Sequence, residues 1–234
     1  MKIIKNILAI LLMLIACSSY SQKIKNKQFS LIGYDLTIAK EFTEELSSLE
    51  PFIKSIKTYN DPGNDKLRAI LIHIIYYSFY DKLKEQLEVE ILPVNTFQRK
   101  VKYDDYGYPK TSAREAIRLG GSKYYFKLDV AINSVVKAKK VEFPEMFENK
   151  DNAITYPEIT VTVTLYNKDG VVPIDKWVGV SNAKYPLEIN EYLLKGFDNT
   201  EMVVLPEEEQ QKDNLYLIMD RALFNAIQDY YTKD

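Results

Sequence analysis

The sequence predicts one domain of the α/β or α+β class, in which helices cover a mixed β-sheet. Residues 65–87 carry apolar side chains at steps of three and four, as in a buried helix. Residues 159–166 alternate strictly between apolar side chains and threonine or tyrosine, as in a strand with one buried face. A layer of helices against a sheet is the simplest arrangement that buries both patterns.

The first elements alternate between strand and helix. Residues 29–38 are strand-like, and residues 39–59 have a helical pattern that Pro51 should kink or restart. A turn is expected at 61–64, before the strongest helix, 65–87.

A short strand, 89–93, and a long loop, 94–111, should come next. Ser112 and Glu115 form a capping box, which begins a short helix that ends at Gly120 and Gly121.

The second half is richer in strands. Residues 123–132 alternate as a strand, and a charged excursion is expected over 137–157. After the strand at 159–166, residues 167–170 should turn the chain into a hairpin partner, 171–180. Pro173 places that partner at a sheet edge or a bulge, and Trp177 is expected in the core.

Three elements complete the predicted chain. They are a short helix at 190–197, an acidic linker at 207–213 and a final helix at 214–231.

The first 21 residues have the pattern of a secretory signal peptide. Lys2 and Lys5 precede an uncharged apolar run, 7–16, which is too short to span a bilayer. Cleavage after Ser21 would leave one domain over 22–234, free in the periplasm or secreted. Alternatively, the residues before Cys17 resemble a lipobox, so that Cys17 would be lipidated and hold the protein at a membrane. Both routes remain open.

Composition excludes several classes of protein. Cys17 is the only cysteine, so a disulfide framework, a thiolate nucleophile and a cysteine-rich metal site are excluded. The net charge is −2, which argues against a nucleic-acid partner. We expect no cofactor and no metal, and membrane contact only through lipid on Cys17.

Residues 65–170 carry motifs of a bacterial envelope domain. A long helix leads to the strand 89–93, a short helix ends in the step 118–125 (Arg-Leu-Gly-Gly-Ser-Lys-Tyr-Tyr), and a later strand ends in the Asp-Gly turn at 168–170. The segment resembles the small α/β domain of the N-terminal part of TolB, of curli-secretion lipoproteins and of lipoprotein activators of cell-wall synthases. The resemblance implies an envelope location and binding of other proteins without catalysis.

Two groups of residues are candidates for function. The segment 103–109 sets carboxylates beside aromatic rings in a Gly/Pro loop, which suits a sugar, a cation or a protein partner; its candidates are Tyr103, Asp104, Asp105, Tyr106 and Tyr108. The alternative is an ordinary loop whose tyrosines pack on the sheet edge. His73, the only histidine, would be central to a hydrolase, although a lone histidine in an apolar helix is usually structural.

We therefore expect a non-catalytic envelope protein, periplasmic or at the outer membrane, that binds another envelope protein or a cell-surface component. A secreted hydrolase using His73 and a carbohydrate or small-ligand binder are the alternatives. The oligomeric state is left open.

Overall fold

A computed structural model of the chain describes residues 24–56, 65–138, 153–183, 187, 189–197 and 213–233. The signal peptide, Cys17, the turn at 61–64 and most of the acidic linker lie outside these residues, as does the middle of the charged excursion.

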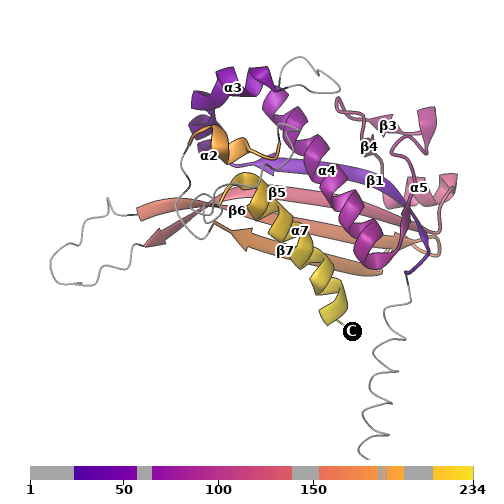
Figure 1. Cartoon of the computed structure of the whole chain (residues 1–234). Coiled ribbons are helices and arrows are strands. Elements are labelled where there is room, and N and C mark those ends of the chain that lie inside the picture. Colours follow the sequence, from indigo (N-terminus) through magenta and orange to yellow (C-terminus); the bar gives the residue numbers. More distant parts are fainter. Residues whose placement is uncertain are drawn as a thin grey trace, which may run out of the picture.

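A mixed seven-stranded sheet forms one layer of a single domain, which confirms the predicted fold class (Figure 1). The strands are β1 (Gln28–Ile38), β2 (Glu90–Ile91), β3 (Lys102–Tyr103), β4 (Pro109–Lys110), β5 (Tyr124–Ala138), β6 (Ala153–Asn167) and β7 (Asp175–Asn182). They lie in the order β3-β4-β1-β5-β6-β7, with β2 paired to β1. β1 runs parallel to β2 and β5, and the other pairs are antiparallel.

Two long helices, α4 (Lys66–Leu87) and α7 (Leu215–Thr232), cross the same face of this sheet (Figure 1). The shorter elements are α2 (Lys40–Leu46), η1 (Ser47–Leu49), α3 (Glu50–Ser55), η2 (Gln98–Lys100), α5 (Ala113–Leu119) and η4 (Glu191–Leu194). The predicted restart at Pro51 is confirmed, because Pro51 lies in the first turn of α3. Asp65, Ser112 and Asn214 cap α4, α5 and α7 through their side chains.

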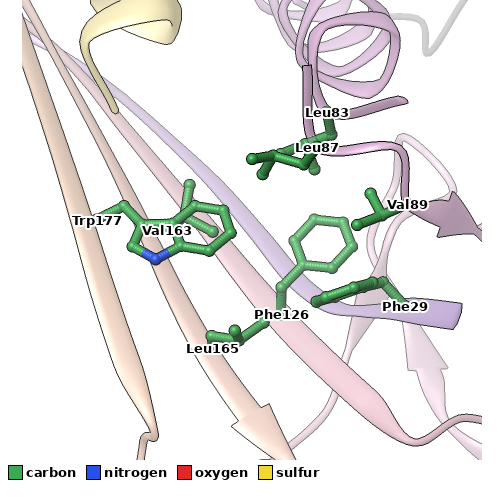
Figure 2. Close-up of a pocket in the computed structure, with 8 residues that line it drawn as sticks. All are labelled: Phe29, Leu83, Leu87, Val89, Phe126, Val163, Leu165 and Trp177. Carbon is green, nitrogen blue, oxygen red and sulfur yellow. The ribbon is translucent and has the colours of Figure 1, made fainter. Parts of the chain in front are cut away.

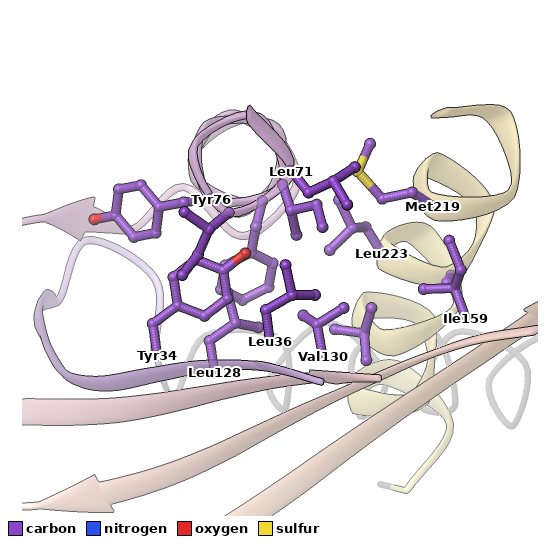
Figure 3. Close-up of a cluster of buried hydrophobic side chains, with 14 of the residues drawn as sticks. Tyr34, Leu36, Leu71, Tyr76, Leu128, Val130, Ile159, Met219 and Leu223 are labelled. Atoms are coloured by element: carbon purple, nitrogen blue, oxygen red, sulfur yellow. The ribbon is translucent and has the colours of Figure 1, made fainter. Parts of the chain in front are cut away.

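The main core lies between the sheet and the two long helices (Figure 3). Alternate residues of β5 and β6 enter it, including Leu128, Val130 and Ile159, and Trp177 enters it from β7. Thr160, Thr162 and Thr164 lie on the other face and are half-buried, as the strict alternation of β6 predicted. A smaller cluster covers part of that face; its buried members are Ile32, Phe97, Val101, Ala116 and Tyr125.

Some predicted ranges were wrong in detail. The loop 94–111 contains η2 and the β3–β4 hairpin, whose second strand pairs with β1 at Gly33. The charged excursion is shorter than 137–157, because β5 continues to Ala138 and β6 begins at Ala153. Both strands extend as a paired ribbon beyond the core, where apolar alternation fades but backbone pairing continues.

β7 begins at Asp175 and not at residue 171 as predicted, so that Pro173 precedes the strand. β7 is an edge strand of the sheet, and α7 covers it closely. Gly179 faces α7, and a Cβ atom there would overlap the carbonyl oxygen of Ala222 and the amide nitrogen of Ala226, and would lie 2.8 Å from the Cα atom of Ala226. Only a glycine allows the two backbones to approach so closely.

A polar stripe formed by α7 and its C-cap residue hydrogen-bonds the free edge of β7. Its four side chains are spaced four residues apart: Arg221, Asn225, Asp229 and Lys233. In the same order they contact backbone groups of Asn182, Val180, Val178 and Lys176, each two residues apart. Four helical residues rise about 6 Å, and two strand residues rise about 6.6 Å. The two spacings therefore match, and the edge is closed to further strands.

Replacing Gly179 by alanine should strongly destabilise the protein. The added methyl group has no space, so α7 must move off the sheet, and we expect a loss of about 3 kcal/mol or more in unfolding free energy. Urea denaturation followed by circular dichroism measures this loss. Gly170→Ala is the matched control, since a Cβ atom there meets nothing nearer than a backbone nitrogen at 4.0 Å. Equal stability of the two variants would contradict the close approach.

Asp229 should make the unfolding free energy depend on pH in the acid range. Burial raises its pKa, but hydrogen bonds from Lys233 and from the amide of Val178 outweigh burial, so that the net pKa is lowered. A carboxylate with a lowered pKa in the folded state stabilises the protein at neutral pH, and this contribution is lost as the pH falls below about 4. We expect Asp229→Asn to be less stable than the wild type at pH 7, with a difference that becomes smaller as the pH falls to 3.

Asp169→Asn, in the exposed β6–β7 turn, is the control for this effect. Chemical denaturation at both pH values checks the prediction. A difference between Asp229→Asn and the wild type that stays constant with pH would contradict it.

Candidate functional site

Six tyrosines gather between α4 and the β3–β4 hairpin, and we call them the tyrosine cluster: Tyr34, Tyr76, Tyr77, Tyr80, Tyr106 and Tyr108. β1 supplies the first, α4 the next three, and the hairpin the last two. The helix brings its tyrosines to one side because residues three and four apart are neighbours on a helix surface. Three segments distant in sequence thus form one aromatic surface.

Tyr108 and Tyr34 form the floor of the cluster, against Tyr76. The ring centroids of Tyr34 and Tyr108 are 5.0 Å apart at 84°, and those of Tyr76 and Tyr108 are 5.1 Å apart at 62°. Figure 3 shows Tyr34 and Tyr76 beside the aliphatic core. All three are buried, and burial raises the pKa of each phenol. These hydroxyls are therefore neutral at physiological pH.

Asp104 builds the turn that carries Tyr106. Its Oδ1 atom accepts hydrogen bonds from the amides of Tyr106, at 3.0 Å, and Tyr108, at 2.8 Å. Gly107 follows with φ of 86°, a conformation that glycine adopts without strain. Burial raises the pKa of Asp104, against these amide hydrogen bonds, which lower it. Asp104 is thus a turn residue, and the exposed carboxylate of the pair is Asp105.

The rim of the cluster is accessible, and it consists of Arg68, His73, Tyr77, Asp105 and Tyr106. Tyr77 is 51% exposed although it belongs to a largely buried helix. The guanidinium carbon of Arg68 lies 6.0 Å from the centroid of Tyr106, and Arg68 also approaches Asp35, at 3.7 Å. The rim therefore combines aromatic faces with charges of both signs.

His73 belongs to this rim through its contact with Tyr77. The two ring centroids are 4.6 Å apart. Burial lowers the pKa of His73, so the imidazole is neutral at pH 7. A neutral ring packed at a tilt of 55° against tyrosine suits a contact surface, and the hydrolase role for His73 stays a prediction.

The structure separates the five candidates of the 103–109 segment. Tyr106 and Asp105 lie on the rim, Asp104 holds the turn, and Tyr103 is half-buried beside the smaller core cluster. Tyr108 is only 5% exposed, so it cannot be a contact residue of the free surface. The contribution of α4 was missed, because Tyr76, Tyr77 and Tyr80 fit equally well into an apolar helical stripe.

An apolar cavity of about 10 Å³ lies elsewhere, between the C-terminal end of α4 and the sheet (Figure 2). It is lined by Phe29, Leu83, Leu87, Val89, Phe126, Val163, Leu165 and Trp177. It has roughly the size of one water molecule and no polar lining, so it is a packing defect and not a ligand site.

Among the described residues, no three His, Cys, Asp or Glu side chains come together as a metal site would require. The described helices include none that is long and apolar enough to cross a membrane.

Comparison with known proteins does not identify a family. No family model matches the chain. No curated protein matches it. Among solved structures, it is similar to the hypothetical protein CT253 from Chlamydia trachomatis, with a TM-score of 0.45 and 9% identity over 89% of this chain and 100% of that one. It is also similar to a structure described as a neuraminyllactose-binding hemagglutinin homolog from Helicobacter pylori, with a TM-score of 0.31 and 12% identity over 91% and 85%. The resemblance to the envelope families stays a prediction.

Tyr108→Ala should reduce the unfolding free energy much more than Tyr106→Ala. Removing the buried ring of Tyr108 should cost about 3 to 5 kcal/mol of unfolding free energy, whereas removing the rim ring of Tyr106 should cost about 1 kcal/mol or less. Thermal and urea unfolding of the two variants measure this. Equal losses would contradict the assignment of Tyr108 to the floor and Tyr106 to the rim.

Proposed function

We propose that this chain is an exported, non-catalytic protein of the bacterial envelope, and that it binds another envelope component through the rim of the tyrosine cluster. The basic and apolar leader supports export to the periplasm or the outer membrane. The partner is a protein or a cell-surface component, because the net charge of −2 argues against a nucleic-acid partner.

The exposure of Tyr77 is the observation that carries this proposal. A large aromatic side chain left half in solvent on a buried helix gains free energy when a partner covers it. Its rotamer freedom is already limited by contacts with His73 and Tyr76, at 4.6 Å and 5.6 Å between ring centroids. Tyrosine anchors of this kind bury much area at a small entropic cost.

The other end of the rim suits a mixed polar and aromatic interface. Tyr106 lies under Arg68, and Asp105 is exposed beside it. Tyrosine and arginine are among the residue types most enriched at the centres of protein interfaces. Because the floor tyrosines are packed into the core, the rim is held in place before a partner arrives, which reduces the cost of ordering it.

Photo-crosslinking at position 77 tests the proposal. A photoreactive amino acid replaces Tyr77 in the full chain, expressed in a bacterium that exports it, and the cells are irradiated. We expect a discrete crosslinked product with an envelope component. Tyr106→Ala in the same background should lower its yield roughly tenfold, as for loss of an interface hot spot.

Position 224 is the matched control. Phe224 is an aromatic residue of α7 with 44% exposure, away from the cluster. A product of equal yield from position 224, or a product from position 77 that Tyr106→Ala leaves unchanged, would contradict the proposal.

A further inference from the structure

The connection between β6 and β7 presents an apolar tip, which we define as residues Val171, Val172 and Ile174. Their exposed fractions are 44%, 73% and 46%, and Pro173 between them is also exposed. Connections on a protein surface are usually polar. Single exposed apolar residues are ordinary, but several within one short turn indicate a surface that a membrane or another molecule covers.

The tip lies at the end of the sheet where the described chain begins. Phe29, at the start of β1, is in register with Tyr124 at the start of β5, which pairs with Asn167, the last residue of β6. Neighbouring strands are about 4.8 Å apart, so the start of β1 and the tip are separated by roughly 10 to 15 Å across the sheet. Figure 1 shows these strand ends together.

Cys17, the candidate site of lipid attachment, precedes this end in the sequence. Cys17 precedes Ile24, the first described residue, by seven positions. Seven residues reach at most about 25 Å when fully extended. If Cys17 carries lipid, the end of the domain that holds the tip is therefore within one short tether of the bilayer.

Exposed lysines surround the tip. Lys123, Lys168 and Lys176 are exposed, and the amide of Lys168 donates to the carbonyl of Lys123 at 3.0 Å. The carboxylate of Asp175 accepts a hydrogen bond from the indole N–H of Trp177, at 2.7 Å, and is half-buried. Asp169 is therefore the exposed acid of the turn. Lysines around an apolar tip match phosphate headgroups around an acyl layer.

We propose that this end of the domain is seated on the lipid surface, with Val171, Val172 and Ile174 inserted at the headgroup boundary. The inference rests on export and lipidation at Cys17. It goes beyond the expectation that membrane contact comes only through lipid on Cys17, because the folded domain adds a second contact. An acyl chain and an inserted apolar turn together hold a fixed orientation, which a flexible tether alone does not.

Depth-dependent fluorescence quenching on vesicles tests this orientation. The mature chain from Cys17 is coupled through its single thiol to a maleimide lipid in vesicles of phosphatidylethanolamine and phosphatidylglycerol, with or without brominated acyl chains. Val172→Trp places a reporter on the tip, and the emission of the wild type, which comes from the buried Trp177, is subtracted. Phe224→Trp places the same reporter on α7, where Phe224 has a comparable exposure to that of Val171 and Ile174.

We expect brominated lipid to quench Val172→Trp and to shift its emission to the blue, and to leave Phe224→Trp unchanged. Adding Ile174→Asp should reverse most of the quenching at position 172. Equal emission of Val172→Trp with and without bromine would overturn the proposal. The apolar tip would then be a contact site for a protein. Equal quenching at both positions would also overturn it. No partner protein is present, so the result is independent of crosslinking at position 77.

Discussion

The close approach of α7 to β7 is the constraint on which the fold depends. Because position 179 has no side chain, the helix rests directly on the strand backbone, and this sets the height of α7 above the sheet. At that height its polar stripe reaches the strand edge and its apolar face meets the main core. α4 then fills the remaining width of the same sheet face, and its outer side is where the tyrosine cluster forms.

Periodic elements could be predicted from the sequence, because one buried face imposes its spacing on the residues. β6, α4 and α7 have such faces; the predicted ranges of the two helices agree with the structure within one residue, and that of β6 agrees at its end but begins six residues late. The β3–β4 hairpin could not be predicted, since each of its strands has only two residues and no periodicity. Its pairing with β1 at Gly33 depends on tertiary contacts.

Only the part of the candidate surface that lies in the 103–109 segment could be predicted from the sequence. Tyr106 and Asp105 stand in a turn whose composition is unusual, and the sequence alone singles them out. Tyr77 does not stand out, because tyrosine is compatible with both a core and an interface, and only the packing of α4 distinguishes it from Tyr76. Its 51% exposure, against 4% for Tyr76, is a property of the assembled structure.

The polar stripe of α7 can cover the edge of β7 only late in synthesis. The strand that needs covering is complete at Asn182, but the helix that covers it begins at Leu215. Until those later residues emerge, the newly made sheet has an open edge with unpaired amides and carbonyls, which is the usual template for association between chains.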